Sequence, residues 1–224
     1  RDSYNNLETF KLVRDHYLNC SNYDDYKFRI VDDGSQHKPL PESEVPGEWD
    51  HYVVENDIGW NNEGCKNLLM QETDTEWNVC LDLDRVMSPM LMKQLPEYIK
   101  TAKKDRLHRF CRVPNSNPIS PNDFLVNYSY FWSKNGYAES YFSDANGRIY
   151  WGGADWTFVG QCKSEILLSF APLYTIHKQI EEPPIDKSLE WKKLNLKPYD
   201  NGKRVNFEWK KINFKNKKNS DLWV

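Results

Sequence analysis

The chain has 224 residues, of which 39% are hydrophobic and 28% charged, with a formal net charge of -3 at pH 7. A mean hydropathy of -0.82 with this apolar content describes a globular chain with one full core and excludes a disordered protein. The sequence pI near 6.0 argues against a general nucleic-acid binder, and no apolar run approaches the ~20 residues that cross a bilayer.

The first hundred residues alternate between helical and strand patterns. In chain order they predict a helix over 6–19, a strand over 26–35, a strand over 49–57, a helix over 61–73, a strand over 76–84 and a helix opened by Pro89. Strands that alternate with helices imply a largely parallel sheet, and such sheets bind ligands beyond the carboxyl ends of their strands.

Four aspartates stand at the carboxyl ends of two of these predicted strands: Asp32, Asp33, Asp82 and Asp84. Alternate residues of a strand point to the same face, so we expect Asp82 and Asp84 to point the same way. Two such carboxylates suit a hard divalent cation, and they equally suit a nucleophile beside a general acid. The strand ends are therefore expected to converge on one site.

The pattern after residue 105 is less regular. It predicts a strand over 122–132, a Gly-rich turn and short helix over 147–159, a strand region over 165–177 and a loop over 178–188. In the tail, from Lys203 to Lys218, basic and aromatic residues alternate, which predicts an edge strand and a solvated charged end. Contact with an anionic surface is the alternative.

The cysteines predict neither a zinc site nor a disulfide scaffold. They are odd in number and show no CxxC spacing: Cys20, Cys65, Cys80, Cys111 and Cys162. Since no signal peptide is visible either, the sequence favours a cytoplasmic protein without a membrane span. The oligomeric state is open.

Several stretches together resemble glycosyltransferases of the GT-A fold. The opening "SYNNLETF…IVDDGS" is similar to family 2 enzymes. The stretches similar to the β-1,4-galactosyltransferase group are "YVVENDIGWNNEGCKNLLM", "WNVCLDLDRVMSP", "NGYAESY", "YWGGADWTF" and "IHKQIEEPP". The resemblance runs from Tyr4 to about Trp209.

This resemblance implies an α/β fold, namely a single GT-A (Rossmann-like) domain with a mostly parallel central sheet flanked by helices. The domain would span residues 1–185, with a nucleotide-binding half (1–104), an acceptor-binding half (105–185) and a C-terminal extension (186–224). A GT-A sheet also needs a central strand before Tyr4, where this chain has three residues. We therefore expect that upstream sequence is missing or that the sheet is completed in another way.

The activity implied by the resemblance is a metal-dependent, inverting transfer of a hexose or N-acetylhexosamine. The donor would be a UDP-sugar, and the acceptor would be a hydroxyl of a carbohydrate or glycoconjugate. Mn²⁺ or Mg²⁺ would bridge the phosphates, held by Asp84, Asp82 and His177. Imidazole favours Mn²⁺ over Mg²⁺, although a lone strand-end histidine is often a plain surface residue.

The residues that the resemblance assigns to nucleotide binding are Tyr4, Asp32, Asp33, Asn61, Lys66 and Asp82. Asp33 would accept the uracil N–H, although an ordinary Asp-Gly-Ser turn would use the same residue. Lys66 stands where the family has arginine. It keeps the charge but loses the bidentate geometry, and it can face either the phosphates or the aspartates of the DxD motif.

Asp155 matches the family's general base, which must lie on the side of the sugar away from the diphosphate. The family usually has glutamate before it, whereas this chain has Ala154, so one candidate base is left. An aspartate here also suits a helix N-cap. The residues implied for acceptor binding are Trp151, Gly153 and Trp132.

Three alternatives remain beside this assignment. A haloacid-dehalogenase-type phosphatase would use Asp82 as nucleophile, but its motif continues with Gly-Thr, whereas Arg85 and Val86 follow here. A sugar-phosphate nucleotidyltransferase would need a Gly-rich basic loop near its start. A catalytically degenerate GT-A protein that binds a sugar or nucleotide is favoured by Ala154 and Lys66.

Overall fold

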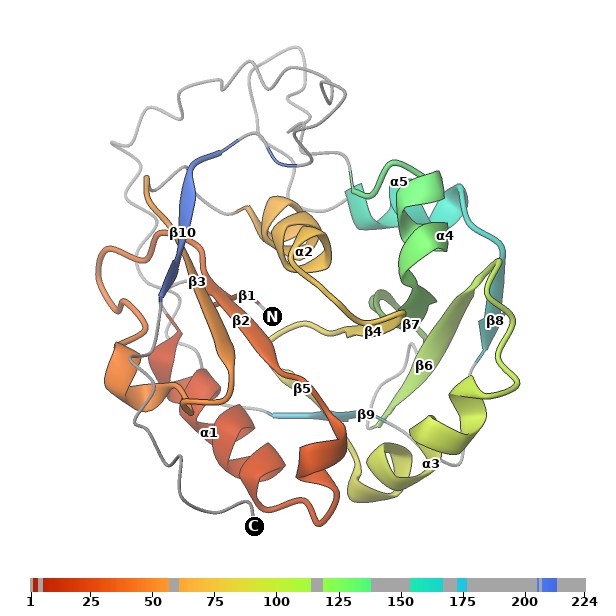
Figure 1. Cartoon of the computed structure of the whole chain (residues 1–224), viewed down its shortest axis with the longest axis horizontal. Helices are drawn as coiled ribbons and strands as arrows, with labels where there is room; N and C mark the ends of the chain where they lie inside the picture. Colours follow the sequence, from red (N-terminus) through yellow and green to blue (C-terminus); the bar gives the residue numbers. More distant parts are fainter. Residues whose placement is uncertain are drawn as a thin grey trace, which may run out of the picture.

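The computed structural model describes residues 2–3, 6–56, 61–113, 119–137, 154–166, 173–176, 205 and 207–212. Its helices are α1 (Leu7–Leu18), α2 (Asn62–Gln71), α3 (Pro89–Ile99), α4 (Tyr128–Ser133) and α5 (Ala154–Gly160), with short 3-10 turns η1 (Tyr23–Asp25) and η2 (Glu42–Glu44). Its strands are β1 (Asp2–Ser3), β2 (Arg29–Asp32), β3 (Asp50–Val54), β4 (Trp77–Cys80), β5 (Arg85–Met87), β6 (Leu107–Val113), β7 (Ile119–Asn127), β8 (Ser164–Ile166), β9 (Leu173–Thr175) and β10 (Trp209–Ile212). Figure 1 shows their arrangement.

The first sheet has the order β1-β2-β3-β10, and its strand β2 packs on both faces. β1, β2 and β3 pair in parallel, and β10 adds antiparallel to β3. Along β2, Ile30 belongs to the apolar cluster under α1, whereas Val31 belongs to the cluster under α2. The apolar run of β2 follows from this two-sided burial.

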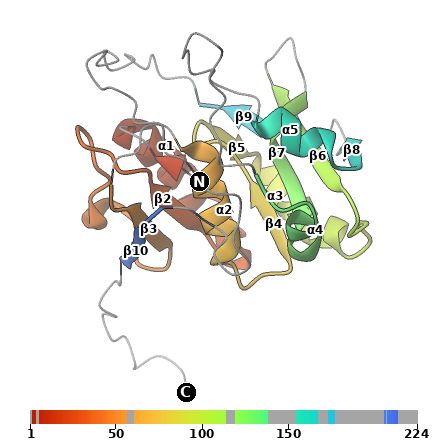
Figure 2. The same ribbon diagram turned by 90° about the horizontal axis from the view of Figure 1, so that it is seen from above.

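The second sheet has the order β4-β7-β6-β9-β5, with β8 also beside β6. Side chains of β7 alternate between two clusters. Leu125 faces the cluster that includes α3, and Phe124 and Val126 face the one that includes α4 and α5. Figures 1 and 2 show α4 and α5 together on one side of β6 and β7.

The fold is mixed α/β, but the prediction of one mostly parallel sheet is only partly right. The described strands form two separate sheets, with four parallel pairings and four antiparallel ones. The parallel core of the first sheet matches the alternation of helices and strands in the first seventy residues. The second sheet is built mainly around the antiparallel β6 and β7, which the less regular sequence after residue 105 did not reveal.

The elements of the first half are confirmed at α1, β2, β3, α2 and α3. One boundary is wrong: the strand expected over 76–84 ends at Cys80, because Leu83 and Asp84 form a turn in which the Arg85 N–H donates to the Asp82 carbonyl at 3.0 Å. Since these residues are not extended, the argument from strand alternation does not apply to Asp82 and Asp84.

The strand expected over 122–132 is also only half right. β7 ends at Asn127, whose side chain accepts hydrogen bonds from the Ser129 and Tyr130 N–H groups and so caps α4. The aromatic residues that follow have strand-like propensity, but this cap starts a helix instead. β6 was not predicted, β8 begins one residue before the expected strand region over 165–177, and β9 lies inside it.

Other expectations concern the tail, the thiols and membrane segments. The predicted edge strand of the tail is present as β10, while most of the basic tail and the loop over 178–188 lie outside the described residues. All five cysteines are free. In the part of the chain that the structure covers, no helix is both long and apolar enough to span a bilayer.

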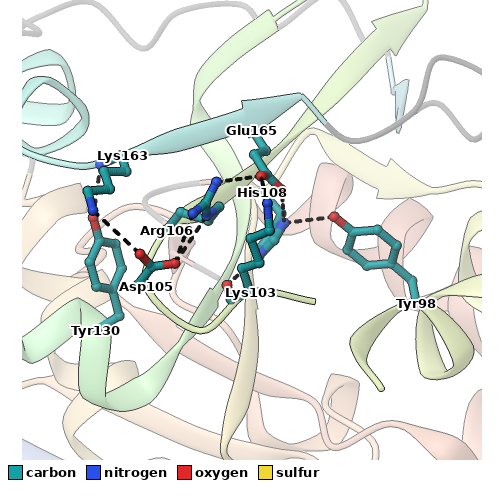
Figure 3. Close-up of polar contacts among 8 residues, drawn as sticks. All are labelled: Tyr98, Lys103, Asp105, Arg106, His108, Tyr130, Lys163 and Glu165. Atoms are coloured by element: carbon teal, nitrogen blue, oxygen red, sulfur yellow. Dashed lines mark hydrogen bonds and ion pairs between the residues drawn. The ribbon is translucent and has the colours of Figure 1, made fainter. Parts of the chain in front are cut away.

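A network of charged side chains closes the outer rim of the second sheet (Figure 3). Glu165 on β8 accepts hydrogen bonds from Arg106 and from Lys103, the latter at 3.1 Å. Buried His108 lies beneath them, with Nε2 2.9 Å from the Lys103 carbonyl and Nδ1 2.7 Å from the Tyr98 hydroxyl. Because a carbonyl only accepts, Nε2 carries the proton and Nδ1 accepts from Tyr98.

Candidate functional site

An ion pair at the end of β4 is the centre of the site. Lys66 on α2 places Nζ 2.8 Å from Oδ1 of Asp82, and the Lys66 side chain is 4% exposed. Asn122 on β7 donates to the other carboxylate oxygen at 3.2 Å. Burial alone lowers the pKa of Lys66, but the charge and hydrogen bond of Asp82 outweigh it, so this pKa lies above its ordinary value. Lys66 is therefore a fixed cation, and of the two partners that the sequence left open it contacts an aspartate of the DxD motif.

The second aspartate of the motif is paired separately. Oδ2 of Asp84 lies 2.6 Å from Nη1 of Arg85, while Nε of Arg85 lies 3.9 Å from the fully buried Asp123. Asp123 also accepts the Asp82 backbone N–H at 3.1 Å, which anchors the start of the turn. The turn thus presents two carboxylates, each beside its own cation.

Tyr137 forms the wall beside this pair, and its position depends on a backbone turn. Asn135 and Gly136 both have positive φ, 64° and 65°. The Asn67 side chain then binds the Tyr137 backbone twice, donating to its carbonyl at 2.8 Å and accepting from its N–H at 2.9 Å. A Cβ on Gly136 would lie 2.7 Å from the Asn67 side-chain oxygen, so this approach requires glycine. Lys66 Nζ lies 5.8 Å from the centre of the Tyr137 ring.

Two further carboxylates act electrostatically on this group. Burial raises the pKa of Glu63 on α2, Lys66 opposes the shift, and the negative charges of Asp155 and Asp82 add to it. Burial likewise raises the pKa of Tyr137, and Asp82, Glu63 and Asp155 contribute in the same direction. Asp155, in the first turn of α5, thus acts electrostatically on Glu63 and Tyr137.

The two aspartates at the end of β2, Asp32 and Asp33, accept hydrogen bonds from backbone N–H groups. Asp32 accepts the N–H of Ser35 at 2.9 Å and of Leu40 at 2.7 Å, and it is 2% exposed. Asp33 is fully buried and accepts the Asn61 N–H at 2.6 Å, which links the end of β2 to the start of α2. The Asn61 side-chain nitrogen is buried and has no hydrogen-bond partner within the described ranges.

The predicted residues on the acceptor side are only partly visible. Asp155 is 8% exposed, and its Oδ1 accepts the Trp156 N–H at 2.8 Å. Trp132 on α4 packs edge-on against Phe131, with ring centres 5.0 Å apart. The other predicted residues, Tyr4, Trp151, Gly153 and His177, lie outside the described residues.

The carboxylates at the end of β4 have the oxygen donors that Mn²⁺ or Mg²⁺ accepts. The side chains of Asp82 and Asp84 are 23% and 35% exposed, so both are accessible. Among the residues that the structure describes, however, no three His, Cys, Asp or Glu side chains gather as a metal-binding group. The third predicted ligand, His177, is not among those residues.

Sequence reasoning missed several residues of this site: Glu63, Asp123, Asn122 and Tyr137. Asp123 could have been found, because a carboxylate opening the apolar run "FLV" is unusual unless it is paired inside the protein. Glu63 gives no such signal, since a glutamate in the first turn of a helix is common.

No protein-family model and no curated protein sequence matches the chain. Among solved structures, it is similar to the crystal structure of S. aureus TarS 1-349, a glycosyltransferase of the GT-A fold, with a TM-score of 0.52 and 12% sequence identity. The match covers 78% of this chain, and the chain spans 58% of that structure. At this identity the similarity establishes the fold alone: the chain has a mixed α/β fold that resembles a GT-A glycosyltransferase.

Proposed function

We propose that this chain is a metal-dependent, inverting glycosyltransferase that moves a hexose or N-acetylhexosamine from a UDP-sugar to a hydroxyl of a glycan or glycoconjugate. One observation supports it most: in a GT-A-like fold, Lys66 pairs with Asp82 in the turn after β4, and Asp82 and Asp155, the latter in the first turn of α5, both act electrostatically on Glu63. These residues offer a fixed cation, a ligand for a metal and a carboxylate to take a proton.

Nucleotide binding would use the junction between β2 and α2. Asp33 and Asn61 meet there, and the buried Asn61 side-chain nitrogen is a donor that a pyrimidine carbonyl would satisfy. Lys66 would then face the diphosphate from α2. A bound Mn²⁺ or Mg²⁺ would neutralise the charge of the leaving nucleotide, with Asp84 and Asp82 among its ligands.

The transfer itself needs a proton acceptor for the attacking hydroxyl, and we assign this role to Asp155. It is largely buried in the first turn of α5, so its carboxylate is held in place rather than free in solvent. The charge of Asp155 acts on Glu63. Glu63 could therefore supply the second carboxylate that the family has before its base, where this chain has Ala154. Trp132 would contact the acceptor, as would Trp151 and Gly153, which stand shortly before Asp155 in the sequence.

The direct test is calorimetric titration of UDP with and without Mn²⁺. We expect binding to require the metal, and Asp84→Asn to weaken it at least tenfold. Asp105→Asn is a matched control, because Asp105 is an exposed carboxylate in the rim network. Absence of UDP binding by the wild-type chain in both conditions would contradict the proposal.

A second candidate function is a GT-A domain that binds a nucleotide or sugar without turnover. The Lys66–Asp82 pair favours it, because the lysine already occupies one oxygen of the DxD motif. A panel of UDP-sugars with Asp155→Asn separates the two. Transfer or donor hydrolysis that falls about 100-fold or more in this variant, with UDP binding retained, supports catalysis. Binding without turnover in the wild type supports the second candidate.

A further inference from the structure

Trp156 on α5 leaves a large indole in solvent, with 55% of the residue exposed. Phe158 and Val159 of the same short helix are instead buried in the apolar cluster beside β7. A single exposed apolar side chain is common on protein surfaces and needs no explanation by itself. Trp156 differs because its ring is restrained and because it stands next to the candidate base.

Arg109 on β6 restrains the indole. Its guanidinium carbon lies 6.0 Å from the centre of the Trp156 ring, within reach of a cation–π interaction. Arg109 follows Leu107 at the two-residue spacing of strand side chains that point to one face, and Leu107 belongs to the apolar cluster that contains Phe158. The guanidinium therefore supports the indole from the side of the sheet, and the exposed surface of the ring lies away from β6.

The indole also lies close to the candidate site. The Trp156 backbone N–H donates to Oδ1 of Asp155 at 2.8 Å, so the ring stands beside the carboxylate to which we assign the proton transfer. On β7, the residue opposite Arg109 stands two positions after Asn122, which donates to Asp82 at 3.2 Å. Two residues of a strand span about 7 Å, so the Arg109–Trp156 pair and the DxD motif are near neighbours.

A restrained, exposed indole beside a carboxylate suits one kind of ligand, a sugar ring. One face of a pyranose presents a row of C–H groups that pack flat against an aromatic face, while the hydroxyls at its edge hydrogen-bond to polar groups. Because Arg109 already restrains the ring, binding loses little side-chain entropy. A ring-free polyol, the hydroxyl of a peptide side chain and the hydroxyl of a lipid offer no such flat face.

We propose that Trp156 and Arg109 form a stacking platform for the acceptor, whose attacking hydroxyl is therefore carried by a pyranose ring. The ring lies flat on the exposed indole, with that hydroxyl toward Asp155. In the transfer, the hydroxyl oxygen bonds to the anomeric carbon of the donor, its proton goes to Asp155, and the bond from that carbon to UDP breaks. The role of the platform rests on the proposed function, but binding of a sugar to Trp156 needs no turnover.

The test is saturation-transfer NMR on the full chain, which detects the ligand hydrogens that contact the protein. The probes are the methyl β-glycosides of glucose, N-acetylglucosamine and galactose, with ribitol as the ring-free control, each with and without UDP and Mn²⁺. The variants are Trp156→Ala and Trp156→Phe, of which the second keeps an aromatic face. Leu12→Ala is the matched control, because Leu12 on α1 is also exposed, at 44%.

We expect a pyranoside to show transfer that is strongest at the C–H groups of one ring face, and ribitol to show none. Trp156→Ala should weaken binding of that pyranoside about fivefold or more, whereas Trp156→Phe should weaken it by less than about twofold and Leu12→Ala should leave it unchanged. Since Trp156 is exposed, its replacement should leave urea unfolding close to that of the wild type.

Two outcomes overturn the platform: no transfer to any of the pyranosides, or transfer that persists in Trp156→Ala. The proposed transferase function is judged separately by UDP binding in the same samples. If UDP binds with Mn²⁺ and no pyranoside does, the platform is wrong and the transferase assignment stands. If a pyranoside binds through Trp156 and UDP does not bind, the sugar platform stands and the transferase assignment is wrong.

Discussion

The turn after β4 and the rim beside β8 both hold acidic and basic side chains together, yet they differ in burial. The Lys66 side chain is 4% exposed beside Asp82, whereas Lys103 and Lys163 in the rim are 61% and 75% exposed beside Glu165 and Asp105. A buried charge needs its partner, while exposed pairs contribute about 0–1 kcal/mol each. Ion pairs with similar distances between their charged atoms can therefore have very different effects on stability.

The two regions also differ in the polar groups that they offer to a ligand. The buried pair is surrounded by groups that a ligand can use, including Asn122, Tyr137 and Glu63. The rim ties α3, β6 and β8 together and leaves its lysines in solvent (Figure 3). Solvent weakens the rim electrostatically, so we expect its ion pairs to contribute little to stability, whereas the buried pair is central to the proposed function.

The largest expected effect comes from removing Asp82. Asp82→Ala leaves the buried Lys66 without its carboxylate, and we expect the free energy of unfolding to fall by about 3 kcal/mol, measured by urea denaturation. The double variant Asp82→Ala/Lys66→Met should recover most of that loss, because the uncompensated charge is gone. If the double variant is as unstable as the single one, burial of Lys66 is not the cause.

Gly136→Ala should have the next largest effect on stability. The new Cβ would meet the Asn67 side chain at 2.7 Å, and alanine disfavours a φ of 65°. We expect a loss of about 2 kcal/mol in thermal or urea unfolding. Gly160→Ala is the matched control, since nothing lies within 4 Å of a Cβ there. Similar losses in both variants would contradict the tight approach of Asn67 to Tyr137.

The pH dependence of stability tests whether buried His108 contributes differently from the exposed charges of the rim. Burial lowers the pKa of His108 below its unfolded value, so its neutral form stabilises the fold above about pH 6.5. This contribution is lost as the pH falls from there through the folded pKa. We expect wild type to lose more unfolding free energy than His108→Gln between pH 7.5 and 5. Parallel pH profiles would place His108 with the exposed groups.

Glu165→Gln should have the smallest effect. Lys103 is 61% exposed and solvent screens the Glu165 carboxylate, so we expect only a small loss of stability in urea unfolding at low salt, shrinking further in 0.5 M salt. A loss as large as that of Asp82→Ala would remove the distinction between the two regions.

The elements that sequence predicts well are those whose burial is regular. β2 and α2 have apolar residues on the faces that pack, and their pattern is legible without tertiary information. The end of β4 cannot be predicted in this way, because the apolar Leu81 and Leu83 continue the strand pattern. In the structure the chain turns there instead, with a hydrogen bond from the Arg85 N–H to the Asp82 carbonyl. Local chemistry of this kind has no clear signature in a hydrophobic pattern.

The candidate site shows the same division. The sequence left Lys66 facing either the phosphates of a nucleotide or the aspartates of the DxD motif, and in the structure it contacts Asp82. Asn122 and Glu63 were missed because each is an ordinary polar residue until the fold brings β7 and α2 beside Asp82. Long-range pairing decides their environment, and a single sequence contains no record of that pairing.

The pairing of β10 with β3 has a kinetic consequence. Trp209 lies opposite Val54, which stands 155 positions earlier, so these two strands meet only after a long loop has closed. Contacts at such separation form slowly, because the chain entropy of closure opposes them before any pairing compensates. During synthesis on the ribosome, β10 cannot pair with β3 until residues 209–212 have emerged. We therefore expect β10 to dock late, as the step that completes the first sheet.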